Sequence, residues 1–124
     1  MNGKDARMAS VWEFQGERNN PHPATFPIVL PLRIIMSLMR DKEGLVLDTY
    51  MGSGTTAIAS KLMGQKYLGI ELSKDYIDMA VSRIRNWNSC DNRALAKKEE
   101  ALHFVKKSFQ DRKKDKQLKI QDLG

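Results

Sequence analysis

The middle of the chain places a helical pattern between two short apolar runs, which predicts a strand–helix–strand unit. The continuous apolar run at 45–48, which ends in an acid, is typical of a strand in a buried parallel sheet, and residues 66–72 predict a second strand. Between them, residues 55–63 are alanine-rich with a helical pattern, and Gly64 suits the C-terminal cap of that helix. We therefore predict a β–α–β unit, the core of an α/β fold.

Helices are expected on either side of this unit. Residues 27–40 are apolar around most of the helix circumference, so this helix should be buried on more than one side. Ser73 is a favourable N-cap for a helix after the second strand. That helix carries apolar residues at spacings of three to four, namely Ile77, Ala80, Val81, Ile84 and Trp87.

The two ends of the chain differ from its centre, and they divide it into three parts. Residues 1–21 have turn-forming residues and little periodicity, which predicts an irregular segment. The α/β half-domain follows at 22–87, and a basic helical tail at 88–124. We expect the tail helix over about 93–112, with frayed or disordered chain beyond. Its apolar stripe is thin and consists of Leu95, Leu102, Val105 and Phe109.

Charge and length narrow the function classes. The 124 residues make at most one domain, and the net charge is +6. Residues 1–84 hold 10 basic and 9 acidic residues, whereas residues 85–124 hold 11 and 6, so the basic excess belongs to the tail. Such a tail favours polyanions such as nucleic acid, and a merely solubilising helix is the alternative.

Three features are absent from the sequence. The single cysteine, Cys90, excludes an internal disulfide and favours a reducing, cytoplasmic location. No apolar run approaches the roughly 18 residues that a membrane span needs. No cluster of His, Cys, Asp or Glu has metal-ligand spacing, so we expect no metal site.

Acidic residues end both predicted strands. Asp48 ends the first strand, and Glu71 lies near the end of the second, roughly 20 residues after a glycine turn. Because the tips of neighbouring parallel strands meet at one edge, the two carboxylates would flank a bound nucleoside, and Glu71 would accept hydrogen bonds from ribose hydroxyls. Gly52 and Gly54 let the backbone pass close to such a ligand.

The turn between these acids also indicates what kind of ligand fits. It lacks the full G-x-G-x-x-G pattern, and no lysine follows the glycines as in a phosphate-binding P-loop. Thr55 and Thr56 open the helix, so their N–H groups have no helical partner and point at the site. Asp48 would repel a phosphate. S-adenosylmethionine, a nucleoside with a cationic and zwitterionic tail, suits this site better than a pyrophosphate; a generic α/β turn is the alternative.

Three segments, taken in their order along the chain, strengthen the prediction of a nucleoside cofactor site. Residues 22–27 are His-Pro-Ala-Thr-Phe-Pro, residues 47–56 are Leu-Asp-Thr-Tyr-Met-Gly-Ser-Gly-Thr-Thr, and residues 68–72 are Leu-Gly-Ile-Glu-Leu. In this order they resemble the cofactor-binding segments of amino-group DNA methyltransferases, which methylate the exocyclic amine of adenine or cytosine. The order resembles the β arrangement, in which the catalytic half comes first. The likeness covers about residues 11–86.

The resemblance implies a partial Rossmann-like methyltransferase fold, S-adenosylmethionine as cofactor and double-stranded DNA as partner. The loop after Asp48 would wrap the methionine part, Glu71 would bind the ribose, and the segment from His22 would line the pocket from the other side. The implied cofactor-binding positions are His22, Pro23, Thr25, Phe26, Asp48, Tyr50, Met51, Gly52, Ser53, Gly54, Thr55, Thr56, Glu71 and Leu72. The tail would contact DNA phosphates through Lys97, Lys98, Lys106, Lys107, Lys113 and Lys114.

One family element is missing. The catalytic tetrad of the family is Asp, Asn or Ser, then Pro-Pro, then an aromatic residue, and no two of the four prolines here are adjacent. The region that reads the target sequence would also lie upstream of Met1. We therefore expect the cofactor-binding half of a split or truncated restriction-modification methyltransferase, inactive alone, with exposed apolar surface and a complementing chain. A dinucleotide-binding α/β domain and a non-catalytic nucleic-acid-binding fragment are the alternatives.

Overall fold

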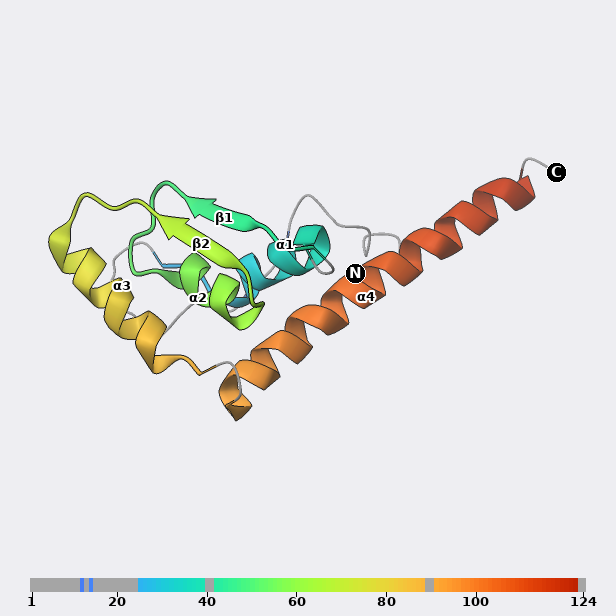
Figure 1. The fold of residues 1–124 in the computed structure, drawn as a ribbon. Helices are drawn as coiled ribbons and strands as arrows, with labels where there is room; N and C mark the ends of the chain where they lie inside the picture. Colours follow the sequence, from blue (N-terminus) through green and yellow to red (C-terminus); the bar gives the residue numbers. More distant parts are fainter. Residues whose placement is uncertain (1–11, 13, 15–24, 40–41, 89–90, 123–124) are drawn as a thin grey trace.

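The fold is an α/β arrangement of two strands and four helices among the residues that the structure describes (Figure 1). The structure is a computed structural model, and it describes residues 12, 14, 25–39, 42–88 and 91–122. Its elements are α1 (Val29–Met39), β1 (Leu45–Asp48), α2 (Thr55–Leu62), β2 (Lys66–Gly69), α3 (Lys74–Asn86) and α4 (Asn92–Asp122).

The two strands form the predicted β–α–β unit. They pair in parallel, with Leu45 opposite Lys66 and Asp48 opposite Gly69, and α2 connects them. β1 has the predicted bounds, whereas β2 ends at Gly69 instead of Leu72. The predicted α/β fold class is therefore confirmed.

Local sequence signals explain where the central helices begin and end. After α2, Gly64 has a φ of 68°, and the N–H of Gln65 donates to the carbonyl of Ser60 at 2.9 Å while the N–H of Gly64 donates to Lys61 at 3.1 Å. This is the Schellman arrangement, which favours glycine at the left-handed position. At α3, the Ser73 side chain accepts a hydrogen bond from the N–H of Tyr76 at 3.3 Å, as expected for an N-cap.

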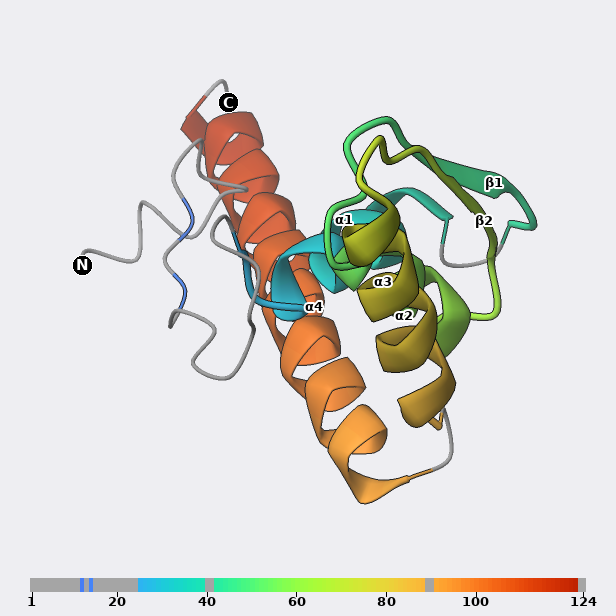
Figure 2. The ribbon, with the colours of Figure 1, turned by 90° about the vertical axis from the view of Figure 1, so that its left-hand side faces the viewer.

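The helices lie on one side of the sheet, in successive layers (Figure 2). α2 packs against both strands, α1 packs against α2, and α4 packs against α1. As predicted, α1 is therefore buried on two sides. The core between these layers is apolar, and its members include Leu32, Ile35, Ile58, Leu62 and Val105.

The other side of the sheet has no covering element among the described residues. Leu47 and Leu68 lie opposite each other in the sheet, and their side chains are 56% and 53% exposed. Leu45 and Ile70 are 60% and 49% exposed. We call these four residues the open face. The prediction of a buried first strand is wrong for Leu45 and Leu47, because the described helices pack on one side of the sheet only. The expected exposed apolar surface is confirmed.

Helix α4 differs from its prediction in length and in which of its residues are buried. It continues to Asp122, past the predicted fraying at residue 112, because no glycine or proline interrupts it and its lysines and glutamines favour helix. Leu95 and Phe109, two members of the predicted stripe, are each 45% exposed. Small side chains instead let α4 approach α1 closely, and its buried residues are Ala94, Ala101, Val105 and Ser108.

The described residues of the N-terminal segment are held by a cation–aromatic cluster. The guanidinium carbon of Arg33 in α1 lies 3.7 Å from the ring centre of Phe104, 4.4 Å from that of Phe14 and 5.8 Å from that of Trp12. Burial lowers the pKa of Arg33, and the carboxylate of Glu100 partly opposes that shift. Trp12 packs in this cluster, and it meets Phe104 edge-on at 5.3 Å.

None of the helices in the described ranges combines the length and apolarity needed to cross a membrane.

Candidate functional site

The chain continues to pair beyond the tips of β1 and β2. The N–H of Ile70 donates to the carbonyl of Asp48 at 2.9 Å, and the N–H of Met51 donates to the carbonyl of Ile70 at 3.0 Å. These bonds bring the loop that follows β1 next to the segment that follows β2. The residues after the two strands therefore share one edge of the sheet, where ligands of α/β proteins bind.

Both predicted carboxylates accept hydrogen bonds from this region. Asp48 Oδ1 accepts from the N–H of Tyr50 at 3.1 Å. Glu71 Oε2 accepts from the N–H of Gly52 at 2.9 Å, and Glu71 Oε1 accepts from the N–H of Ser73 at 3.0 Å. Each carboxylate oxygen has two lone pairs, so these bonds leave capacity for the hydroxyl or ammonium groups of a ligand.

The glycine turn is shaped by the helix beneath it. Gly54 has a φ of 84°, and a Cβ at this position would lie 2.9 Å from the Cβ of Ala80 in α3. Both the backbone conformation and the close approach of α3 therefore require glycine here. We call residues 52–55 the glycine loop.

Helix α2 begins directly at the end of the glycine loop. The side chain of Thr55 is buried and that of Thr56 is half-buried. The first N–H groups of a helix have no helical acceptor and carry the positive end of the helix dipole. An anionic group of a ligand is therefore favoured at this position.

Two large side chains are exposed beside these polar groups. Tyr50, two residues after β1, is 90% exposed, and Leu72, which follows Glu71, is 101% exposed. Neither is needed to build the described core. They can contact the flat apolar faces of a base, and sequence reasoning placed both among the cofactor-binding residues.

The structure places the remaining predicted residues as follows. Met51 lies in the same turn, and its side chain fills the space above Gly69. Thr25 and Phe26 are half-buried in the chain that leads into α1. His22 and Pro23 lie outside the described residues.

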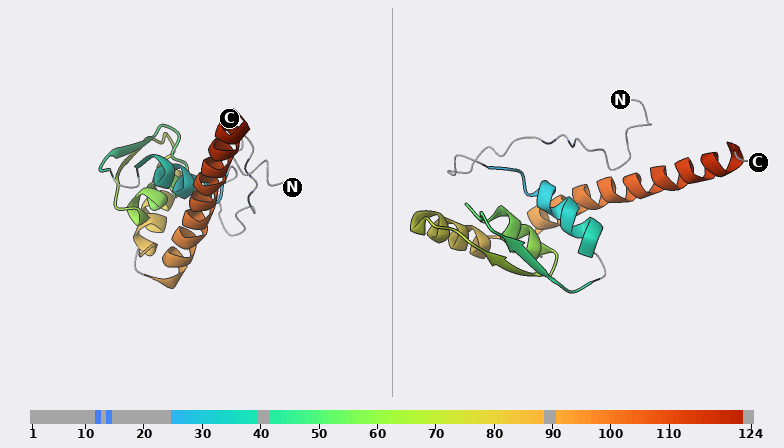
Figure 3. Two further views of the ribbon diagram at one scale, coloured as in Figure 1. Left: turned by 90° about the vertical axis from the view of Figure 1, so that its right-hand side faces the viewer. Right: turned by 90° about the horizontal axis from the view of Figure 1, so that it is seen from above.

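The predicted DNA-contacting lysines fall into two groups. Lys97 and Lys98 are half-buried on the part of α4 that packs on α1, and Lys97 pairs with Glu100 at 3.6 Å. The other four, Lys106, Lys107, Lys113 and Lys114, are exposed. The end of α4 that carries Lys113 and Lys114 extends past the other described elements (Figures 1 and 3).

One residue at the site was missed by sequence reasoning. Arg83 Nη1 donates to the carbonyl of Ser53 at 2.7 Å, to Ser53 Oγ at 2.8 Å and to Thr55 Oγ1 at 3.2 Å. Nothing in the local pattern indicates this role, because Arg83 is one of several polar residues in an amphipathic helix.

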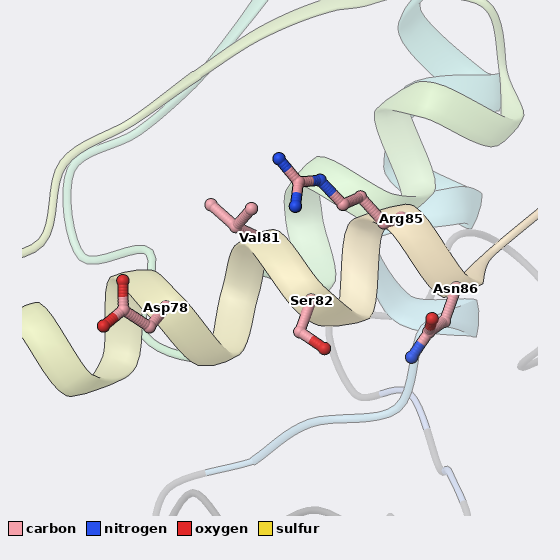
Figure 4. Close-up of a pocket in the computed structure, with 5 residues that line it drawn as sticks. All are labelled: Asp78, Val81, Ser82, Arg85 and Asn86. Atoms are coloured by element: carbon pink, nitrogen blue, oxygen red, sulfur yellow. The ribbon is translucent and has the colours of Figure 1, made fainter.

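A hollow of about 300 Å³ lies on α3 (Figure 4). Its described lining comes from this one helix, and no residue of the glycine loop is among it. The lining residues are Asp78, Val81, Ser82, Arg85 and Asn86.

Among the described residues, no group of three or more His, Cys, Asp or Glu side chains is placed to hold a metal ion.

Comparison with known proteins gives the following matches. The profile of a DNA methylase family, N6_N4_Mtase, matches residues 1–82. The type II methyltransferase M.BglI of Bacillus subtilis is 34% identical over 111 residues, which are 89% of this chain and 31% of that protein. The type II methyltransferase M.ScaI of Streptomyces caespitosus is 40% identical over 83 residues, with coverage of 60% and 27%.

A solved structure also matches. It is described as the crystal structure of the M1.HpyAVI–SAM complex, with a TM-score of 0.46 and 35% sequence identity over 52% of this chain and 32% of that chain. The chain spans less than a third of the length of the two methyltransferases above.

Proposed function

We propose that this chain, which belongs to the N6/N4 DNA methylase family, binds S-adenosylmethionine at the glycine loop and forms the cofactor-binding part of a restriction-modification DNA methyltransferase. One observation carries the proposal. Asp48 and Glu71 both accept hydrogen bonds from the turn that leads into α2, at the shared edge of two parallel strands.

The residues at this edge fit the parts of that cofactor. Glu71 would accept the ribose hydroxyls, and the exposed Tyr50 and Leu72 would contact the adenine. Asp48 would attract the ammonium group of the methionine end, and the first N–H groups of α2 would attract its carboxylate. When bound, S-adenosylmethionine supplies an activated methyl group on a sulfonium.

Calorimetry with the full chain tests this site. We expect S-adenosylmethionine to bind, and Glu71→Gln and Asp48→Asn to weaken binding at least about tenfold, because hydrogen bonds to charged groups contribute about 1.5–3 kcal/mol. Glu99→Gln, an exposed position on α4, is the matched control and should bind like the wild type. Tight NAD binding without a response to S-adenosylmethionine would instead establish a dinucleotide site.

A complementing chain with the catalytic tetrad is the second part of the proposal. Parallel sheets are normally covered on both faces, and stable sheets usually have three or more strands. The open face and the two-stranded sheet supply neither condition within the described residues. The complement would add strands and cover the open face, and it would place the target base against the methyl donor.

Co-expression tests the complementing chain. The protein encoded immediately upstream should contain an Asp-Pro-Pro-Tyr-like tetrad, and the mixture should transfer a labelled methyl group to DNA while neither chain does so alone. Leu47→Asp should abolish transfer by the mixture, because it places a charge on the open face. Exposed Leu38 on α1, away from the proposed DNA-contacting lysines, is the matched control, and Leu38→Asp should leave transfer unchanged. Full activity of this chain by itself would reject the split.

Contact of α4 with DNA phosphates is the third part. Lys106 and Lys107 lie seven residues before Lys113 and Lys114, so the two pairs repeat on one face about 10 Å apart. Exposed lysines on one face favour phosphate contact without sequence reading.

Paired substitutions test these lysines. Lys113→Gln with Lys114→Gln should weaken binding to duplex DNA and reduce the slope of log K against log salt by about 2. The control pair, Lys42→Gln with Lys66→Gln, removes the same charge from exposed positions outside α4 and should leave the slope unchanged. Equal loss in both pairs would show that net charge alone attracts DNA. Deleting α4 is unsuitable, because Ala94, Ala101 and Val105 belong to the core.

A further inference from the structure

Two oppositely charged side chains that follow β2 contact consecutive residues of the glycine loop. Glu71 accepts from the N–H of Gly52 at 2.9 Å, and Arg83 donates to the carbonyl of Ser53 at 2.7 Å. The loop is therefore attached at a donor by the carboxylate and at an acceptor by the guanidinium. Only Glu71 was expected from the sequence.

Arg83 reaches the loop because α3 lies directly beneath it. Ala80 is fully buried, and its Cβ occupies the space where a side chain at Gly54 would extend. Arg83 follows one helical turn later and so lies on the same side of α3. From there its Nη1 contacts the carbonyl and hydroxyl of Ser53 and the hydroxyl of Thr55.

The position of this guanidinium is not explained by helix stability. A cation beside the N-terminus of α2 faces the positive end of that helix dipole, which is unfavourable. Three contacts of Arg83 oppose this repulsion. They are charge-assisted, and each goes to residue 53 or 55. The arrangement therefore stabilises one conformation of the loop at the expense of local electrostatics.

We propose that Arg83 is the positioning residue that fixes the glycine loop in the shape that receives the amino-acid end of the methyl donor. This inference rests on the proposed function for its ligand but not for its structural part. Arg83 acts through Ser53 and Thr55, whereas Glu71 serves the nucleoside end. Loss of Arg83 should therefore selectively weaken binding of the amino-acid end of the ligand.

The first experiment measures amide hydrogen exchange of the full chain by NMR without ligand. Arg83→Gln should speed exchange of the Gly54 amide, which donates to Met51, at least tenfold, and leave the amides of α1 and the core part of α4 unchanged. Arg83→Lys keeps the charge and much of the stem and should show a smaller increase. Arg85→Gln, at the exposed arginine of α3, is the matched control and should show none.

The second experiment compares two ligands by calorimetry. S-adenosylmethionine has the amino-acid end, and 5′-methylthioadenosine has the nucleoside without it. Arg83→Gln should weaken the first at least tenfold and the second less than threefold, and Arg83→Lys should recover part of the loss. A role in stability alone would weaken both ligands equally.

The outcomes separate this inference from the proposed function. Unchanged exchange at Gly54 in Arg83→Gln overturns the positioning role, whatever the ligand data show. Faster exchange throughout α1 and α4 in both Arg83 variants also overturns it, because the residue would then stabilise the fold as a whole. Selective loop exchange in a chain that does not bind S-adenosylmethionine supports the structural part and rejects the proposed function.

Discussion

The two faces of the sheet both carry apolar residues, but their surroundings differ. On one face, Val46 packs against the core built by α2 and α1, where Leu32 and Ile58 have no exposed surface. On the other face, Leu47 and Leu68 are about half exposed. The described helices lie on the opposite side of β1 and β2 (Figures 1 and 2).

The composition of β1 is typical of a strand in a larger sheet than the one that the described residues form. The strands of an antiparallel sheet with one solvent-exposed face alternate apolar and polar residues, whereas strands covered on both faces are apolar throughout. β1 has the sequence Leu-Val-Leu before Asp48. It therefore has the apolar pattern of a strand covered on both faces, although the described helices cover only one face. The open face is the surface that the proposed complementing chain would cover.

The largest expected difference between the two faces comes from one substitution made on both. Ile58→Ala removes a fully buried side chain between the sheet and α1 and should lower the free energy of unfolding by about 2–5 kcal/mol. Ile70→Ala makes the same change on the open face and should lower it by less than about 1 kcal/mol. Urea unfolding measures both. Equal losses would show that the open face is covered in solution.

The second expected difference compares two glycines with positive φ. Gly54 faces α3 and Gly64 has no atom within 4 Å of a built Cβ. Gly64→Ala should cost about 1 kcal/mol for the backbone alone, whereas Gly54→Ala adds the clash with Ala80 and should cost about 2–3 kcal/mol. Thermal unfolding measures the stabilities, and calorimetry should show that only Gly54→Ala weakens S-adenosylmethionine binding. Equal stabilities would mean that α3 does not press on the loop.

The elements predicted correctly are those with a local physical cause. The bounds of β1 follow from its apolar run and its terminal acid, the end of α2 from the left-handed Gly64, and the start of α3 from the Ser73 cap. The convergence of Asp48 and Glu71 on one turn also follows from local signals, because parallel strands joined by a helix bring their tips to the same edge.

The elements missed depend on tertiary contacts. The buried residues of α4 are mainly small, such as Ala94 and Ala101. They were missed because the prediction followed the large apolar residues of the helix, whereas close packing against α1 favours small ones. Exposure of β1 and β2 depends on which layers are present, and strand composition does not report that. Arg83 is 30 residues from Ser53, so only the packing of α3 beneath the loop reveals their contact.

The smallest expected effects come from neighbouring residues of β1 that point to opposite faces. Val46→Thr keeps the shape and strand preference but places a hydroxyl against the core, which should lower the free energy of unfolding by about 1–2 kcal/mol. Leu47→Thr places the same side chain on the open face and should change it by less than about 0.5 kcal/mol. Leu47→Thr should also reduce self-association in sedimentation experiments, because it removes exposed apolar area. If Leu47→Thr were the more destabilising of the two, the face that the helices leave bare would be the better-packed one in solution, and the proposal of a missing layer would fail with it.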